Sequence, residues 1–427
     1  MADNMQLSSL SANNLEQCLK CSICTVYCPV SAVTTDYPGP KHAGPDGERY
    51  RLKDPKYFDE KALKLCLNCK RCEVACPQGV KVGDIIQSAR IKYSNHMPGL
   101  RDFALASTDL VGGLATKLAP VVNYTLGLKP VKSVMHSTMG VDKHRTFPKY
   151  ASQTFEAWYK KEAKASQSSF PRQISFFHGC YVNYNFPQLG KDLLKIMNAI
   201  GYGVHLLDKE KCCGVAYIAN GMPRKAARNG EANMKAMRTS IAKGRQIITT
   251  SSTCTFTMRD EYEHLLHIDN DVARNSLSLA TRFIYRLVEA GDVKLAFRQD
   301  YKKRVAYHTA CHMERLGWAV YSTGLLKMIP GLELVMLDSQ CCGIGGTYGF
   351  KKENYRISQD IGYGLFKQIK EAEVDCVSTD CETCKWQIEM SAGVTVQNPI
   401  SIIAEALDVE ATKALNINSV EHYQKDK

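Results

Sequence analysis

The sequence has 427 residues, with 55 Lys and Arg against 43 Asp and Glu, and a formal net charge of +12. That length corresponds to roughly three domains, and a hydrophobic content of 44% without low-complexity tracts excludes an intrinsically disordered chain. The opening residues MADNMQLSSL do not resemble a secretory signal, and no run of 18 or more apolar residues predicts a membrane-spanning helix. The 18 cysteines therefore indicate metal or redox chemistry and argue against disulfides.

In chain order, the first feature is a pair of motifs, each with the pattern C-x2-C-x2-C-x3-C-P. In two-cluster ferredoxins, three cysteines of one motif and the last cysteine of the other hold each [4Fe–4S] cluster. The spacing predicts one cluster on Cys18, Cys21, Cys24 and Cys76, and a second on Cys66, Cys69, Cys72 and Cys28. Zinc is the less favoured alternative, because zinc sites favour two separated C-x2-C pairs.

The residues around these motifs favour helices. The motifs are separated by 37 residues, more than a compact βαβ-type ferredoxin needs, and helical sequence occupies 59–64 and 82–93. We therefore predict an α-helical ferredoxin domain over residues 1–95.

Residues 96–170 contain no cysteine and form a basic connecting segment, with a solvated linker expected at 164–171. Five apolar residues lie at helical spacing, with Pro120 expected to end or kink the helix: Leu110, Leu114, Leu118, Val121 and Val122. One interpretation is an interfacial helix on an anionic membrane. The favoured alternative is a helix packed on the ferredoxin core or on a partner subunit.

The remaining cysteines belong to a sequence that repeats itself. Cys180, the pair Cys212-Cys213 and Cys254 recur as Cys311, Cys341-Cys342 and Cys381, at offsets of 131, 129 and 127 residues. The steady offset indicates a tandem duplication of one CCG domain. We place the copies at 171–300 and 301–410, with a tail at 411–427.

Each repeat alternates short β-rich runs with helical patterns. Strands are expected at 174–177, 204–207 and 246–250, and again at 304–307, 333–337 and 374–378, with helices between them. This alternation predicts parallel sheets covered by helices. The cysteines follow the strands, so loops at the carboxyl ends should bring them together. The predicted fold is thus multidomain: an α-helical ferredoxin domain followed by a duplicated α/β cysteine-rich domain.

The two repeats differ in their cysteine sets. The second offers five thiols, Cys311, Cys341, Cys342, Cys381 and Cys384, for which an iron–sulfur site is favoured over zinc. The first offers Cys180, Cys212, Cys213 and Cys254, with Thr257 at the fifth position, and could hold zinc, a cluster or nothing. We expect Cys376 to be a core residue, and His178, His308 and His312 to be neighbours of the sites or core residues more often than ligands.

Two ferredoxin motifs followed by two CCG domains resemble the iron–sulfur subunits of respiratory flavin dehydrogenases and of the heterodisulfide reductase family. The order, the length and the segment GVDKHRTFPKYASQTFEAW are most similar to the C subunits of anaerobic glycerol-3-phosphate dehydrogenases. The resemblance implies a non-cubane [4Fe–4S] cluster on the five cysteines of the second repeat. It also implies flavin-containing partners of the dehydrogenase A and B type that oxidise sn-glycerol 3-phosphate, with delivery of electrons to membrane quinone.

The predicted function is that of a non-catalytic electron-transfer subunit, peripheral on the cytoplasmic face of the inner membrane. Alternatives are the iron–sulfur subunit of a glycolate or lactate oxidase, a heterodisulfide-reductase-type catalytic subunit, and a structural membrane anchor with zinc in both repeats. Nucleic acid is not an expected partner, because the positive charge is spread along the chain.

Overall fold

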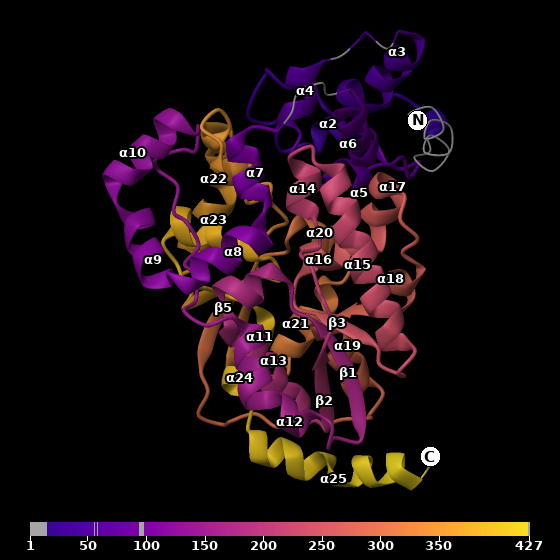
Figure 1. Cartoon of the computed structure of the whole chain (residues 1–427), viewed down its shortest axis with the longest axis vertical. Coiled ribbons are helices and arrows are strands. Elements are labelled where there is room, and N and C mark those ends of the chain that lie inside the picture. Colours follow the sequence, from indigo (N-terminus) through magenta and orange to yellow (C-terminus); the bar gives the residue numbers. More distant parts are fainter. Residues whose placement is uncertain (1–14, 55, 58, 94–97, 426–427) are drawn as a thin grey trace.

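The structure, a computed structural model, describes residues 15–54, 56–57, 59–93 and 98–425, with side chains as far as residue 417. Figure 1 shows an elongated molecule with the ferredoxin domain, described within residues 15–93 and called the head below, at one end. The last helix, α25 (Val409–Lys425), lies at the other end. The two repeats lie between them, and the connecting segment projects from one side. The predicted fold class, a helical head followed by a duplicated α/β unit, is confirmed.

The described part of the head is helical and contains no strand. Its helices are α2 (Ile23–Val26), α3 (Gly47–Lys53), α4 (Glu60–Leu65), α5 (Arg71–Val74) and α6 (Val82–Tyr93). Asp59 caps α4 by accepting a hydrogen bond from the amide of Ala62 (3.1 Å). Helix α6 buries Val82, Ile85 and Ile86 against the head core. Both helices predicted beside the motifs are therefore present.

Between residues 100 and 138 the connecting segment forms four short helices: α7 (Leu100–Ala106), α8 (Thr108–Lys117), α9 (Ala119–Gly127) and α10 (Lys129–Thr138). The predicted interruption occurs at Leu118, with Pro120 in the first turn of α9, where a proline needs no amide partner. Leu110, Leu114 and Leu118 are each more than half exposed. Packing of this stripe on the ferredoxin core, one of our expectations, is therefore wrong.

The first repeat contains a four-stranded parallel sheet in the order β2-β1-β3-β4. Its strands are β1 (Arg172–Phe177), β2 (Tyr202–Leu206), β3 (Ile247–Thr249) and β4 (Leu277–Leu279). Its helices are α11 (Phe155–Trp158), α12 (Lys164–Gln167), α13 (Pro187–Ala199), α14 (Val215–Ala219), α15 (Pro223–Ile241), α16 (Ser252–Phe256), α17 (Tyr262–Leu266), α18 (Asp271–Ser276) and α19 (Ala280–Glu289).

The second repeat has the same topology, with the order β6-β5-β7-β8. Its strands are β5 (Lys303–Tyr307), β6 (Leu332–Met336), β7 (Cys376–Ser378) and β8 (Val396–Gln397). Its helices are α20 (Cys311–Leu316), α21 (Ala319–Lys327), α22 (Tyr355–Glu371), α23 (Glu382–Ala392) and α24 (Pro399–Ala406). The six predicted strands are present, and the short edge strands β4 and β8 were missed.

One hydrophobic core joins the two repeats: Ile174 and Phe176 of β1 share it with Val305 and Tyr307 of β5. The linker expected at 164–171 is wrong in part, because α12 occupies its first half. Gln167 at the end of that helix is 1% exposed and accepts a hydrogen bond from the amide of Val204 (2.9 Å). The segment therefore packs on the first sheet.

Candidate metal centres

The head gathers its eight motif cysteines into two groups. Cys18, Cys21, Cys24 and Cys76 line one cavity, and Cys28, Cys66, Cys69 and Cys72 line another. These are the two crossed sets that the motif spacing predicted. Burial raises the pKa of Cys69 to about 12 and that of Cys72 well above its ordinary value. Metal ligation at these thiols must therefore displace protons.

The two motifs share strained, left-handed backbone conformations at equivalent positions around their cavities. Lys20 and Ser22 in the first motif have φ of 59° and 66°, and Asn68 and Lys70 hold the equivalent places with 57° and 61°. Left-handed φ is unfavourable for such residues and persists where the surroundings require it. The bends let the loop pass closely around its cysteines, and the amide of Asn68 reaches the Cys66 sulfur (3.4 Å). Both loops thus fit a group bound inside them.

A buried charge network joins the head to the first repeat. The Lys70 ammonium contacts Asp84 and lies 3.7 Å from carboxylate oxygens of both Glu73 and Glu261. Burial alone would lower the pKa of Lys70, but the three carboxylates hold it well above its ordinary value. The side-chain amide of Asn68 donates a hydrogen bond to Glu261 (2.7 Å). Lys70 is therefore a charged anchor between two domains.

The four cysteines of the first repeat lie in contact with one another. A hydrogen bond with Cys212 raises the pKa of Cys180 well above its ordinary value. Hydrogen bonds with Cys212 and, to a smaller extent, with Cys254 raise the pKa of Cys213 in the same way. Thr257, at the position of the missing fifth cysteine, is fully buried. Its hydroxyl donates to Glu261 (2.8 Å), which belongs to the charge network described above.

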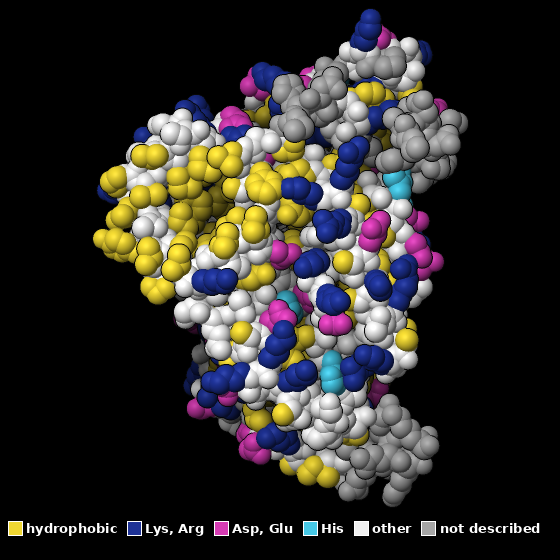
Figure 2. Space-filling model, viewed as in Figure 1, with side chains coloured by type: hydrophobic (Ala, Val, Ile, Leu, Met, Phe, Trp, Pro, Cys, Tyr) yellow, Lys and Arg dark blue, Asp and Glu magenta, His cyan; other side chains and the backbone are white. Residues whose placement is uncertain are grey.

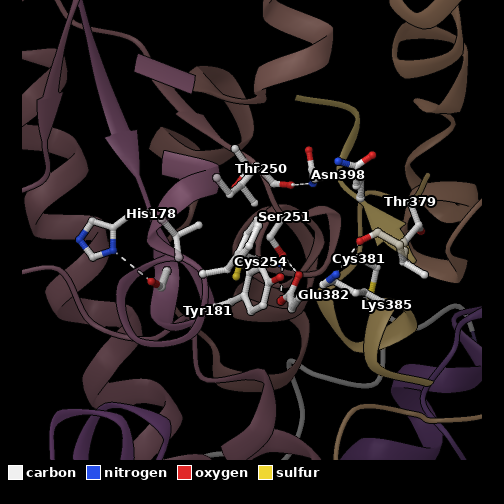
Figure 3. Close-up of a pocket in the computed structure, with 16 residues that line it drawn as sticks. His178, Tyr181, Thr250, Ser251, Cys254, Thr379, Cys381, Glu382, Lys385 and Asn398 are labelled. Atoms are coloured by element: carbon white, nitrogen blue, oxygen red, sulfur yellow. Dashed lines mark hydrogen bonds between the residues drawn. The ribbon is translucent and has the colours of Figure 1, made fainter. Parts of the chain in front are cut away.

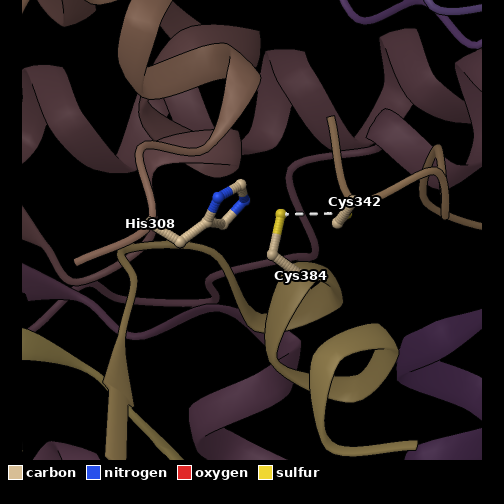
Figure 4. A group of neighbouring side chains, drawn as sticks. All are labelled: His308, Cys342 and Cys384. Atoms are coloured by element: carbon tan, nitrogen blue, oxygen red, sulfur yellow. Dashed lines mark hydrogen bonds between the residues drawn. The ribbon is translucent and has the colours of Figure 1, made fainter. Parts of the chain in front are cut away.

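In the second repeat, the sulfurs of Cys342 and Cys384 lie 3.3 Å apart, with the His308 ring beside them (Figure 4). Contacts with Cys341 and Cys384 hold the pKa of Cys342 well below its ordinary range. Cys384 likewise lowers the pKa of Cys381 to about 5. Metals bind the thiolate form of cysteine, which a lowered pKa favours.

A glycine makes the paired-cysteine turn of the second repeat possible. Gly343 has φ +83°, and a Cβ there would lie 2.0 Å from the carbonyl oxygen of Ser358. Its amide donates to the sulfur of Cys341 (3.4 Å). No other residue fits this place without moving α22, which begins just before Ser358.

The two repeats meet along their cysteines. The amide of Ser252 donates to the carbonyl oxygen of Asp380 (2.9 Å), and Thr253 Oγ1 lies 3.5 Å from the sulfur of Cys381. Figure 3 shows Ser251 and Cys254 of the first repeat beside Glu382 of the second. Ser251 donates to this carboxylate (3.0 Å), and burial, followed by Cys381, raises the pKa of Glu382 to about 8.

A large cavity, of about 320 Å³, is lined by cysteines of three of the four groups. Its wall includes Cys69 of the head, all four cysteines of the first repeat and all five of the second repeat's set: Cys180, Cys212, Cys213, Cys254, Cys311, Cys341, Cys342, Cys381 and Cys384. Val111, Leu126, Met135 and Phe147 from the connecting segment supply apolar surface. Buried and half-buried thiols in this number, lining one cavity, fit iron–sulfur or zinc binding and have no evident role as simple packing.

Known proteins share both parts of this architecture. Residues 14–80 match the 4Fe-4S dicluster domain family, and residues 174–259 and 305–389 match the cysteine-rich domain family. The C subunit of anaerobic glycerol-3-phosphate dehydrogenase from Escherichia coli K12 is 54% identical over 399 residues, which cover 93% of this chain and all of that protein. The chain belongs to this C-subunit family.

Two more distant relatives are proteins of other kinds. The D subunit of the dihydromethanophenazine:CoB–CoM heterodisulfide reductase of Methanosarcina barkeri is 23% identical, with 96% of this chain and 98% of that protein covered. Lactate utilization protein A of Geobacillus kaustophilus is 30% identical over 49% of this chain and 87% of that protein. The dicluster match identifies the head of the chain as an iron–sulfur domain.

The structure also places Cys376 and His312, which we did not expect to be metal ligands. Cys376 is 1% exposed within β7 and interacts with Gln397, away from the cysteine groups, as expected of a core residue. His312 stacks on Phe256 (ring centroids 4.8 Å apart). Sequence reasoning missed Lys70 and Glu382, although each is a charged residue inside a C-x2-C segment, which is an available signal.

Proposed function

We propose that the chain is the iron–sulfur electron-transfer subunit of a quinone-linked glycerol-3-phosphate dehydrogenase complex that works under anaerobic conditions. The clusters, when bound, carry single electrons from flavin-containing partner subunits, which oxidise sn-glycerol 3-phosphate, to membrane quinone. Identity of 54% to the Escherichia coli protein along its full length supports the proposal. The observation that carries it is the placement of Cys69 of the head in the same cavity as Cys311 and Cys341.

The head offers a surface on which a partner can dock. Cys21 is exposed, and around it Leu19, Val26 and Tyr27 are each more than half exposed. Exposed apolar side chains of this size mark interaction sites. The flavin-containing subunit is proposed to cover this face, which brings it next to the group held by Cys18, Cys21, Cys24 and Cys76.

The large cavity is the proposed place where quinone is reduced. Its lining is predominantly apolar, as a quinone ring requires, and it includes thiols of both repeats. Helices α8 to α10 form part of its wall through Val111, Leu126 and Met135. The same helices expose apolar residues on their outer side, so a lipid-soluble acceptor has a short route between membrane and cavity.

The outer side of these helices is the proposed membrane contact. Figure 2 shows hydrophobic side chains gathered over α8 to α10. They include Leu110, Leu114, Leu118, Val121, Tyr124 and Val134, each more than half exposed. Among the described residues, no helix has both the length and the apolarity needed to span a bilayer. Peripheral docking on an anionic inner-membrane surface, on its cytoplasmic face, is therefore the proposed mode.

Flotation with anionic vesicles tests this contact. The double variant Leu114→Glu, Leu118→Glu should abolish co-flotation, because both apolar side chains would leave the lipid surface and negative charge would be added. Val320 is exposed to a similar extent (64%) elsewhere on the molecule. Val320→Glu is the matched control and should float like the wild type, and equal flotation of all variants would refute the contact.

The electron path is tested in the complex assembled with its flavin-containing partners. In Cys311→Ser, glycerol 3-phosphate should still reduce the head clusters, as seen by electron paramagnetic resonance, while reduction of a soluble quinone analogue is lost. Cys376→Ser, at a buried thiol outside the sites, should leave both unchanged. Undiminished quinone reduction by Cys311→Ser would remove the second repeat from the path.

The shared cavity also supports a second candidate, reduction of a substrate disulfide, because thiols of both repeats surround one space. This candidate predicts that the isolated chain, supplied with a low-potential reductant, cleaves a small disulfide. The electron-transfer proposal predicts no such turnover.

A further inference from the structure

The two repeats carry a histidine at the same place in their folds. His178 directly follows β1 and His308 directly follows β5, the equivalent strands of the two sheets. Each precedes the first cysteine of its repeat, Cys180 or Cys311, by two or three residues. Because the repeats arose from one domain, the contacts of the two histidine rings can be compared directly, and a difference between them indicates different roles.

In the first repeat, Nδ1 of the ring contacts its own loop and Glu210. His178 Nδ1 lies 3.0 Å from the carbonyl oxygen of Gly179 and 3.3 Å from a carboxylate oxygen of Glu210. Glu210 also accepts hydrogen bonds from the amides of His178 (3.2 Å) and Gly179 (2.7 Å). In Figure 3 the His178 ring points away from Cys254. This histidine holds a loop and faces no metal site.

In the second repeat the ring has lost that partner. The position of Glu210, two residues before the paired cysteines, is occupied by Ser339, whose carbonyl oxygen instead accepts from Arg71 of the head (2.9 Å). His308 is 1% exposed, its backbone amide donates to Ser378 (2.9 Å), and neither ring nitrogen has a hydrogen-bond partner among the described residues. A buried imidazole without a partner is unfavourable unless something else binds it.

The ring is turned toward the thiols. A ring nitrogen of His308 and the sulfurs of Cys342 and Cys384 all lie within 4.8 Å of one another (Figure 4). Two donors on one iron or zinc ion lie at most about 4.6 Å apart, twice a metal–sulfur bond of about 2.3 Å. The three atoms therefore need little movement to share an ion. Histidine nitrogen is an established iron ligand in some iron–sulfur centres.

We propose that His308 is a nitrogen ligand of the metal centre in the second repeat, alongside Cys342 and Cys384. The inference rests on the proposed function only in requiring that this repeat holds iron. His312, although it directly follows Cys311 in sequence, illustrates the alternative of a core histidine. Its ring stacks on Phe256 and its Nε2 faces the carbonyl oxygen of Asn68 (3.4 Å), so it is already satisfied.

The experiment uses the full chain, purified anaerobically with its clusters and labelled with ¹⁵N-histidine. Iron and acid-labile sulfide are counted, and pulsed electron paramagnetic resonance is recorded on the reduced and partly oxidised protein. Two cubanes account for about eight irons and an occupied second repeat for about twelve. The variants are His308→Ala, His308→Cys, which offers a replacement thiolate, and the matched control His178→Ala.

We expect the wild type and His178→Ala to contain about twelve irons and to show a ¹⁵N-histidine coupling strong enough for a directly bonded nitrogen. His308→Ala should fall toward eight irons with unchanged cubane signals, which also show that the head is folded. His308→Cys should retain the iron and lose the nitrogen coupling.

Two results would overturn the inference, and they are distinguishable. If the wild type contains twelve irons but shows no strong nitrogen coupling, or if His308→Cys retains the coupling, His308 is not a ligand while the proposed electron path stands. If the wild type itself contains only about eight irons, the second repeat holds no iron, and both proposals fail together.

Discussion

The two cysteine-rich repeats share a sheet topology but use equivalent positions for different purposes. Where the second repeat has Cys384 in the large cavity, the first has Thr257, whose hydroxyl is bound to Glu261. Where His308 faces thiols, His178 is bound to its own loop and Glu210. Two donor positions of the first repeat are thus taken up by structural contacts.

The difference indicates that the two copies of a duplicated domain have taken on different roles. Glu261 of the first repeat contacts Asn68 and Lys70, which flank Cys69 in the head. The first repeat thereby helps to fix the head in place, while the second keeps a fifth thiol, Cys384, in the cavity next to Cys69. We infer that the first copy became a support and the second retained the redox centre.

The largest expected effect comes from the equivalent substitutions Cys342→Ser and Cys213→Ser, made in the complex with its flavin-containing partners. Cys342→Ser should abolish quinone reduction driven by glycerol 3-phosphate, because it removes a thiol that lies 3.3 Å from Cys384 in the proposed centre. Cys213→Ser should retain most of the activity. Equal loss in the two variants would show that both repeats are required for electron transfer and would break the comparison.

The support role predicts a large stability effect at Lys70. Lys70→Met leaves Asp84, Glu73 and Glu261 buried without their cation, which should lower the free energy of unfolding by about 3–5 kcal/mol. Lys61 forms an exposed pair with Asp36 in the same domain, so Lys61→Met should cost about 1 kcal/mol or less. Denaturant unfolding of anaerobic protein measures both, and similar values would argue against a head anchored through Lys70.

Restoring the fifth cysteine of the first repeat should not restore a metal site. The Thr257 side chain is committed to Glu261, so Thr257→Cys should leave the iron count unchanged. It should lower stability by about 1–2 kcal/mol, because a thiol is a weak donor to the carboxylate. A gain of about four irons per chain would show instead that the first repeat is a complete site lacking only one ligand.

Much of this architecture could be predicted because its signals are local. Cysteine spacing predicted the two groups in the head, and the offset between Cys212 and Cys341 revealed the duplication. Short apolar or β-rich runs located six strands. β4 was missed because its three residues run directly into α19, and β8 was missed because it has only two residues.

What escaped prediction depends on contacts between distant residues. The partners of Lys70 include Glu261, 191 positions along the chain, so its place inside a C-x2-C segment marks the lysine but cannot identify its partners. The exposure of Leu114 depends equally on which surfaces fold against it. The different fates of His178 and His308 follow from Glu210 and Ser339, whose effect appears only when the loops lie together.

The smallest expected effect compares the two sheets. His205 on β2 lies against Gln173, and burial, followed by Arg245, lowers its pKa to about 4. The equivalent register position in the second sheet is Leu334, which does not titrate. Because the folded pKa lies below the unfolded value of about 6.5, the unfolded chain takes up the proton first. The contribution of His205 to stability is therefore fully present above about pH 6.5 and declines as the pH falls toward 4.

His205→Leu should remove this decline. The ring is half-buried and partly screened, so the difference between wild type and variant should change by about 1 kcal/mol or less as the pH falls. Denaturation midpoints of the two proteins, measured between about pH 7.5 and 5.5 where clusters and fold are kept, give that difference. If both proteins lose stability in parallel, the acid sensitivity lies elsewhere, and the two sheets do not differ in the way their sequences suggest.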